Sequence, residues 1–185
     1  MDPLPKKTRR VFNEPGHAHY LTFSCQQGFP LLSRDRTRQW TVDAISAARK
    51  RHEFDLYAYV IMPEHVHLLV RPRCSVYRME EFLKAVKRPV SWNAKQFLLE
   101  SGSHEWLGRL TVTKGKRKVF RFWEAGGGFD RNITRVEDVR PIADYIHENP
   151  VRRGLAAKAT DWPWSSARYY AGLDGAFLET DSIPT

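Results

Sequence analysis

The sequence predicts an α+β fold in which helices cover an antiparallel sheet. Three observations support this prediction: short runs of alternating or β-branched apolar residues, longer segments with apolar residues at helical spacing, and the order in which the two kinds of segment follow each other. With 185 residues, the chain is long enough to bury a core as one domain.

The first half of the chain contains three predicted strands and one predicted helix. Alternation over residues 19–25 predicts the first strand, and Ser33 is placed to cap a helix over residues 34–51. Residues 54–62 and 65–71 are predicted strands, and within residues 59–70 two apolar runs with β-branched side chains flank a Pro-Glu dipeptide. This pattern predicts two antiparallel strands joined by a tight turn.

The second half is predicted to contain further helices and a fourth strand. A helix begins at Met79, and Pro89 should kink or divide it before residues 92–99 continue it. Residues 102–118 have the pattern of a loop. Residues 129–133 can form a strand after three consecutive glycines, which we interpret as a bend because no P-loop motif follows them.

A last helix is predicted from the capping-box pair Thr134 and Glu137. It should end near Asn149, because Pro150 disfavours helical geometry in the residue before it. The resulting order is β-α-β-β-α-β followed by a helix. This order fits a ferredoxin-like antiparallel sheet.

Two histidine pairs have the spacing that puts both rings on one face of a strand. His65 and His67 flank Val66 at the start of an apolar strand, where two adjacent imidazoles can hold one metal ion. His17 and His19 have the same spacing, so spacing alone leaves a solvent-exposed hairpin edge as the alternative. Because the first and third strands of the predicted sheet run in opposite directions, the two pairs should lie at its opposite ends.

Tyr145 and Asn149 are four residues apart on the last predicted helix. Four residues of an α-helix bring two side chains to within about 40° of each other around the axis. A phenol and an amide oxygen can therefore face the same point beside the sheet. The alternatives are a tyrosine at the edge of the core and an asparagine that ends the helix.

The charge of the chain favours a polyanionic partner. Lys and Arg number 30 against 21 Asp and Glu, which gives a net charge of +9. A basic protein without such a partner is the alternative. The basic side chains that we expect to contact phosphates are Lys84, Lys87 and Arg88 on the second helix, Lys116, Arg117 and Lys118 in a charged segment, and Arg152 and Arg153 after the last helix.

The cysteines and the apolar runs bear on the compartment. Cys25 and Cys74 form no CxxC pattern, which favours a reducing cytoplasm. No apolar run approaches the roughly 20 residues needed to span a bilayer. The first residues lack the apolar region of an export signal. We therefore expect a cytoplasmic protein.

Several separated motifs resemble the REP-associated tyrosine transposases, a family within the wider group of single-tyrosine HUH transposases. The resemblance runs over roughly residues 17–170, and the motifs occur in the order of the family. They are His65-Val66-His67 after Met62-Pro63-Glu64, the segment Phe122-Trp123-Glu124, and residues 144–155 and 161–166.

The resemblance implies a metal-dependent single-stranded DNA endonuclease and strand transferase that acts at palindromic, REP-like repeats through a 5′-phosphotyrosine intermediate. His65, His67 and Asn149 would hold the metal. Tyr145 would be the nucleophile, and Glu64 could orient a histidine. The family suggests Mg²⁺ or Mn²⁺, although imidazole ligands by themselves favour transition metals. No nucleotide cofactor is needed, because a covalent intermediate preserves the energy of the cleaved bond.

The implied partner is single-stranded or hairpin DNA, without a membrane. Relatives in the wider group work as dimers, so a homodimer is one alternative. Two other functions stay open: a non-catalytic nucleic-acid-binding module with the ferredoxin-like fold, and a metallophosphoesterase that uses water as the nucleophile. The chain would divide into a basic N-terminal arm of residues 1–16, a catalytic domain of residues 17–155, and a packing segment and tail of residues 156–185.

Overall fold

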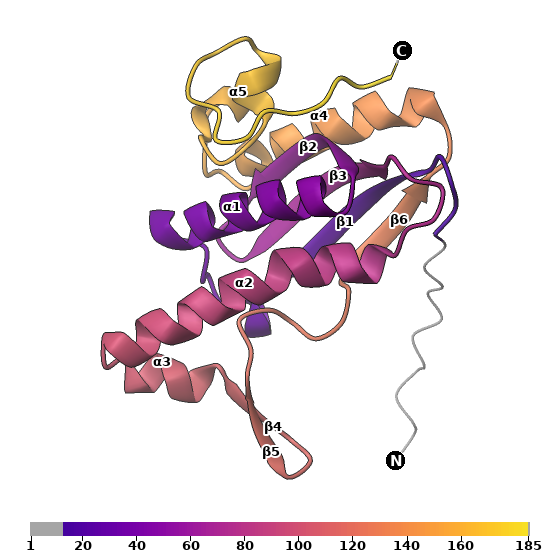
Figure 1. The fold of residues 1–185 in the computed structure, drawn as a ribbon. Helices are drawn as coiled ribbons and strands as arrows, with labels where there is room; N and C mark the ends of the chain where they lie inside the picture. The colour runs from indigo at the N-terminus through magenta and orange to yellow at the C-terminus, as the bar shows by residue number, and fades with distance from the viewer. Residues whose placement is uncertain (1–12, 185) are drawn as a thin grey trace, which may run out of the picture.

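The computed structural model describes residues 13–184, and its central element is a four-stranded sheet. The strand order is β2-β3-β1-β6, and every pair of neighbours is antiparallel. One helix follows the first strand and another follows the third, which confirms the predicted ferredoxin-like fold (Figure 1). The strands are β1 (Ala18–Ser24), β2 (Phe54–Ile61), β3 (His65–Pro72) and β6 (Phe129–Ile133).

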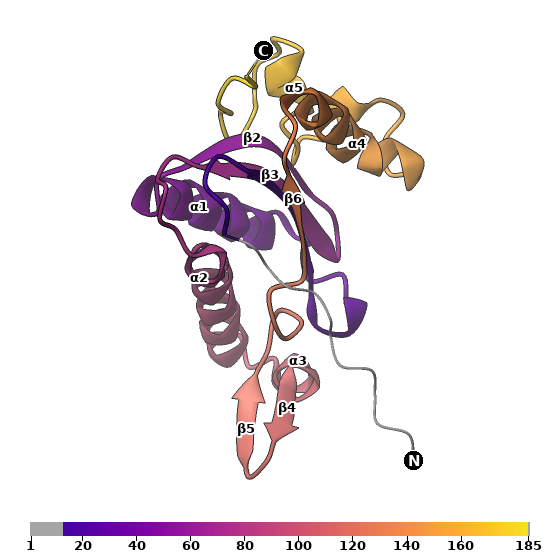
Figure 2. The same ribbon diagram turned by 90° about the vertical axis from the view of Figure 1, so that its right-hand side faces the viewer.

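Helices cover both faces of the sheet (Figures 1 and 2). Helices α1 (Asp35–Arg51) and α2 (Met79–Glu100) pack on one face, and α4 (Val139–Arg152) packs on the other. A short helix, α3 (His104–Arg109), leads into a separate hairpin of β4 (Thr111–Lys114) and β5 (Arg117–Phe120). The remaining elements are α5 (Ala167–Tyr170) and the 3₁₀ turns η1 (Gln26–Gly28), η2 (Val136–Asp138) and η3 (Ala159–Asp161).

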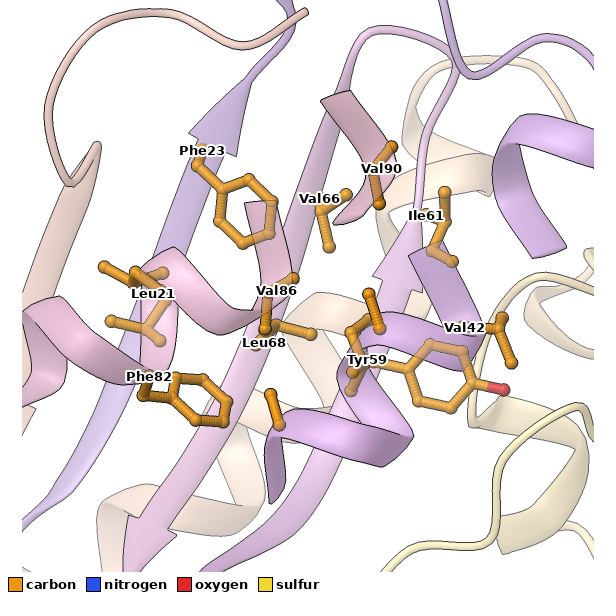
Figure 3. Close-up of a cluster of buried hydrophobic side chains, with 14 of the residues drawn as sticks. Leu21, Phe23, Val42, Tyr59, Ile61, Val66, Leu68, Phe82, Val86 and Val90 are labelled. Atoms are coloured by element: carbon orange, nitrogen blue, oxygen red, sulfur yellow. The ribbon is translucent and has the colours of Figure 1, made fainter. Parts of the chain in front are cut away.

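The larger core lies between the sheet and the helices α1 and α2 (Figure 3). Val66 and Leu68 of β3 face it together with Phe23 of β1, Val42 of α1 and Phe82 of α2, and all five are buried. Because side chains alternate along a strand, the β3 residues on either side of Val66 and Leu68 face α4. The Val66 face of β3 therefore belongs to the larger core.

A second, smaller core lies between the sheet and α4. Leu69 of β3 packs there with Val139, Ala143 and Ile146, which lie along one stripe of α4. His67 is two residues before Leu69 on the same strand, so it points to the same side of the sheet. The histidine face is therefore the face that carries α4.

The segment of residues 102–118 is not a loop, and the prediction there is wrong. It contains α3, β4 and the first two residues of β5, and the β4–β5 hairpin projects away from the sheet in Figure 2. Gly115 has a φ of +60° in the tight turn between Lys114 and Arg117. A glycine with positive φ suits a short hairpin turn, and the threonines and valine beside it favour strands.

The beginnings of two helices differ from the predictions. Ser33 does not cap α1: the helix begins at Asp35, and the position before it is Arg34, which makes no side-chain cap. Thr134 and Glu137 form no capping box either, because α4 begins only at Val139 and the Glu137 carboxylate instead accepts from Arg135. In each case the helix starts later in the sequence than predicted, so a different residue occupies the N-cap position: Arg34 for α1 and Asp138 for α4.

Both internal prolines are accommodated within helices. Pro89 does not divide the second helix, because α2 runs without interruption to Glu100. The predicted end at Asn149 is also wrong, because α4 continues through Pro150 to Arg152. Pro150 cannot donate to the Ile146 carbonyl, but the side-chain amide of Asn149 lies 3.5 Å from that oxygen and donates to it.

The C-terminal segment packs against the edge strand β2. The backbone of Ile61 donates to Trp164, that of Ser166 donates to Tyr59, and that of Asp181 donates to Leu56. These bonds satisfy backbone groups that an edge strand would otherwise expose. The proposed division of the chain at residues 16 and 155 stays a prediction, and most of the basic arm, residues 1–12, lies outside the described residues.

Within residues 13–184, no helix has both the length and the apolar character needed to cross a membrane.

Gly128 sits where the glycine segment meets β1. Its φ is +80°, and a Cβ atom placed there would overlap the Thr22 carbonyl oxygen and lie 3.1 Å from Phe23 Cα. Gly128→Ala should lower the free energy of unfolding by about 2 kcal/mol or more, from backbone strain and the clash together. Urea denaturation measures this change.

Gly127→Ala is the matched control, because its Cβ would make an ordinary contact of 3.6 Å with Leu83. We expect this variant to stay within about 1 kcal/mol of the parent. Equal stability of the two variants would contradict the close approach of the glycine segment to β1.

Candidate active site

The pairing of β1 with β3 brings the site together. His67 of β3 is opposite Thr22 of β1, and His65 is opposite Ser24. The turn before His65 is held by the residue that follows β1, because the backbone N–H of Cys25 donates to the Glu64 carbonyl at 2.8 Å. The two histidines therefore stand at the end of the sheet where β1 finishes and β3 begins.

The two imidazole rings are nearly perpendicular, with an angle of 86° between their planes, and their Nε2 atoms approach each other. The Nε2 atoms of His65 and His67 are 3.0 Å apart. The other nitrogen of each ring has a protein partner: Nδ1 of His65 is 3.1 Å from Glu64 Oε1, and Nδ1 of His67 is 2.8 Å from Thr22 Oγ1 and 2.9 Å from the Tyr20 hydroxyl. Because an ionised carboxylate can only accept, Nδ1 of His65 donates to Glu64 and Nε2 presents a lone pair.

Burial keeps both imidazoles neutral. Removal from water, together with the smaller effect of the neighbouring His65, lowers the pKa of His67 to about 3. Burial also lowers the pKa of His65, against the opposing effect of the Glu64 carboxylate. Neutral imidazoles are the form that binds metal ions, so both rings are ready to act as ligands near neutral pH.

Tyr145 lies beside the histidines on the α4 side of the sheet. Its ring centroid is 6.4 Å from that of His67 and 6.2 Å from that of Tyr20. The guanidinium carbon of Arg152 lies 4.9 Å from the centroid of the Tyr145 ring. Tyr145 is 42% exposed, so a large substrate can reach it. The predicted approach of this tyrosine to the histidine pair is present within a single chain.

Asn149 is one helical turn after Tyr145 and is buried. Its Nδ2 atom donates to the Tyr145 carbonyl at 2.8 Å, so the amide is tied to its own helix. No hydrogen bond joins Asn149 to either histidine among residues 13–184, and its Oδ1 atom accepts none there. The structure thus places Asn149 on the tyrosine helix without a hydrogen bond to the histidines in this part of the chain.

Glu64 connects the histidine pair to the end of α4. One carboxylate oxygen, Oε1, lies 3.1 Å from His65 Nδ1 and 2.9 Å from Arg153 Nη1. The arginine follows directly after α4, the helix that carries Tyr145. This chain of contacts links the turn before β3 to the tyrosine helix.

Apart from Arg152 and Arg153, the basic residues predicted to contact phosphates lie on α2 and on the β4–β5 hairpin. Lys84 pairs with two glutamates of its own helix, and the Lys87 ammonium donates to the carbonyls of Glu124 and Gly126. Burial lowers the pKa of Lys87 to about 8. The remaining predicted cations are exposed and have no salt bridge in the described part of the chain: Arg88 on α2 and Lys116, Arg117 and Lys118 on the β4–β5 hairpin.

The second histidine pair is at the other end of the sheet, as predicted. His19 is opposite Val70 in the β1–β3 register, whereas His65 is at the start of β3. His19 is fully buried, with Nδ1 at 2.8 Å from Asp130 Oδ1 and Nε2 at 2.7 Å from the Tyr77 hydroxyl. Both ring nitrogens are thus used inside the protein, which assigns this histidine to the core.

Two residues of the site were not predicted. Thr22 and Tyr20 both contact His67 Nδ1, and the Tyr20 ring stacks on the imidazole at a centroid distance of 5.6 Å. Their alternation with Leu21 placed them on the same strand face as each other, but only the register with β3 shows that this face meets His67.

The donor set fits one divalent cation. Two nitrogen ligands that bind an octahedral ion at about 2.1 Å and at a right angle would be about 3.0 Å apart, the distance observed between the Nε2 atoms. No group of three or more His, Cys, Asp or Glu side chains in residues 13–184 is arranged to hold a metal. Further ligands would therefore be an amide oxygen, water or the substrate.

A ferredoxin-like sheet with a histidine pair and a tyrosine from a following helix is the arrangement that the motifs imply for single-tyrosine HUH transposases. No protein-family model matches the chain.

The chain is 26% identical over 149 residues to a protein of Haemophilus influenzae that is provisionally named a REP-associated tyrosine transposase, with 75% of this chain and 77% of that protein covered. It is also 26% identical over 132 residues to the REP-associated tyrosine transposase of Escherichia coli, with 66% of this chain and 60% of that protein covered.

The fold is similar to that of a solved REP-associated tyrosine transposase bound to a REP hairpin, with a TM-score of 0.69, 19% identity and coverage of 97% and 94% of the two chains. The predicted resemblance to the REP-associated tyrosine transposases is confirmed by these relatives.

Proposed function

We propose that this protein is a metal-dependent endonuclease and strand transferase that cleaves single-stranded DNA beside a palindromic, REP-like hairpin through a 5′-phosphotyrosine intermediate. The observation that carries the proposal is the meeting of Tyr145 with the facing His65–His67 pair at one end of the sheet. The relatives named above support the choice of substrate, since one of them is bound to a REP hairpin.

Tyr145 is the proposed nucleophile. Its phenolic oxygen would attack phosphorus in line, form the Tyr–O–P bond and break the bond to the 3′ oxygen, which leaves as a 3′-hydroxyl after taking a proton. The tyrosine proton passes to solvent or to a base on the substrate side. Attack by the 3′-hydroxyl of another end reverses these steps and releases the tyrosine, so joining needs no nucleotide cofactor.

His65 and His67 are the proposed metal ligands, and Asn149 Oδ1 is the proposed third one after a rotation of its amide. A bound Mg²⁺ or Mn²⁺ would neutralise charge on a nonbridging phosphate oxygen. Glu64 keeps the Nε2 lone pair of His65 available. Metal binding by His67 would require its Nδ1–H to donate to Thr22 Oγ1 or to the Tyr20 hydroxyl, which lie 2.8 and 2.9 Å away. Arg152 and Arg153 add positive charge beside the reacting phosphate.

The site needs no second protomer for this chemistry, because the tyrosine and both histidines come from one chain. We therefore propose that the tyrosine acts in cis, whether or not two chains associate. Both cysteines are free, which supports a reducing cytoplasm as the compartment.

Tyr145→Phe should abolish the covalent protein–DNA adduct. The test uses labelled hairpins whose single-stranded flanks have randomised sequence, incubated with the protein and Mn²⁺, and detects the adduct on a denaturing gel. Mass spectrometry of the linked peptide should identify Tyr145 in the parent protein.

Tyr20→Phe is the matched control, because Tyr20 lies 6.2 Å from Tyr145 between ring centroids and also contacts His67. We expect this variant to keep forming adduct, at a reduced rate. An undiminished adduct in Tyr145→Phe would refute the nucleophile. Cleavage without any adduct would favour the phosphoesterase, and salt-sensitive binding without cleavage would favour the non-catalytic module.

Glu64→Gln should weaken Mn²⁺ binding about tenfold, because a neutral amide holds the Nδ1–H of His65 less well and lowers the basicity of Nε2. Titration calorimetry or the EPR signal of free Mn²⁺ measures the affinity without DNA.

Glu137→Gln is the control, because Glu137 also accepts from an arginine, Arg135, but is exposed. It should bind Mn²⁺ as the parent does. If Glu64→Gln binds as tightly as Glu137→Gln, the orienting role of Glu64 is wrong.

A further inference from the structure

A groove of about 1370 Å³ lies between α2, the β4–β5 hairpin and the segment of residues 121–128. None of His65, His67 and Tyr145 lines it. Seven lining side chains are basic and three are acidic, so the groove carries a net positive charge. The basic ones are Lys84, Lys87, Arg88, Lys95, Lys114, Lys118 and Arg121, and the acidic ones are Glu80, Glu124 and Asp130.

Most of the basic side chains that line the groove form no salt bridge with another described residue. Lys84 is paired with glutamates, and Lys87 holds the carbonyls of Glu124 and Gly126 at the groove wall. The other five basic side chains have no salt bridge within residues 13–184. Cations that point into a groove without a protein anion suit a phosphate backbone.

The groove also offers an aromatic surface. Trp92 is 64% exposed, although a tryptophan usually buries most of its ring. Arg88, Trp92 and Lys95 are spaced by four and three residues on α2, so they lie on one face of that helix. An exposed indole between two cations can stack on an unpaired base while its neighbours bind the flanking phosphates.

The groove is connected to the candidate active site by the glycine segment. Gly126 to Gly128 line it, and Gly128 lies directly against the backbone of Thr22. The Thr22 side chain reaches His67 from the other face of the same strand. Figures 1 and 2 show this connection running from the projecting hairpin back to β6 beside α2. The glycine segment therefore joins the groove to β1 on the face of the sheet opposite the one that carries the histidines.

We propose that this groove binds a single-stranded segment of nucleic acid, with Trp92 as a stacking platform and Arg88, Lys95, Lys114, Lys118 and Arg121 as phosphate ligands. The proposal deepens the proposed function, because it assigns the single-stranded flank of the substrate to the groove. It adds Trp92, Lys95, Lys114 and Arg121 to the predicted DNA contacts and leaves Lys87 in a structural role.

The test measures equilibrium binding of a fluorescent 16-nucleotide oligothymidylate and of a 16-base-pair duplex, with EDTA present so that no cleavage occurs. Trp92→Ala should weaken binding of the single strand about tenfold, the loss expected for one stacked base. The combined variant Lys114→Ala, Lys118→Ala should reduce the slope of log affinity against log salt by about 1.4 for the single strand.

Matched controls are Tyr169→Ala, which removes an exposed aromatic ring from α5, and the combined variant Lys50→Ala, Arg51→Ala, which removes two charges at the end of α1. Both should bind the oligothymidylate like the parent. All the substituted residues are exposed, and thermal unfolding verifies that every variant is folded.

Three results would overturn the groove assignment: parental affinity in both groove variants, an equal loss in the controls, or tighter binding of the duplex with the same sensitivity to Trp92→Ala. These outcomes are separate from the adduct assay. A parent protein that forms adduct while its groove variants bind normally refutes only the groove. A protein that binds single strands through the groove but forms no adduct refutes only the proposed chemistry.

Discussion

The antiparallel pairing of β1 with β3 is the interaction on which the candidate site depends. Its register places Thr22 opposite His67 and brings the Tyr20 ring onto the same imidazole. A shift by one residue would turn these side chains to the opposite face, where Val66 and Phe23 pack in the core. A change of register would expose the apolar side chains of the core face to water. The burial of those side chains therefore also determines which side chains of β1 and β3 meet on the other face.

The second requirement is the docking of α4 on that face. Its apolar stripe packs in the smaller core, and Tyr145 lies beside that stripe near the edge, exposed enough for a substrate to reach it. The ion pair between Glu64 and Arg153 then ties the end of the helix to the turn before β3. Buried apolar contacts position the helix. The ion pair links the end of the helix to His65, because the partly buried Glu64 carboxylate contacts both Arg153 and that histidine. The groups of the candidate site come from three segments of one chain: β1, β3 and α4.

Much of the fold could be predicted from local pattern, and so could the strand and helix positions of the candidate site residues. Strand alternation located β3 and the histidine face, and helical spacing put Tyr145 and Asn149 on one flank. Thr22 and Tyr20 could not be found in this way, because their contact with His67 depends on a register between segments 45 and 47 residues apart. The β4–β5 hairpin was missed because its strands have four residues each and charged side chains dominate the segment. The end of α4 was misplaced because the backbone restriction before Pro150 does not stop the helix, which continues to Arg152.

The central claim is that His65 and His67 share one cation next to Tyr145. The most direct measurement is a crystal structure of the protein grown with Mn²⁺, with data collected at a wavelength where manganese scatters anomalously. We predict one anomalous peak between the two Nε2 atoms, at about 2.1–2.3 Å from each, with the Tyr145 ring of the same chain beside it. Occupied manganese elsewhere with none at the histidine pair, or a Tyr145 ring turned away from the peak in both the chain and any partner, would contradict this account.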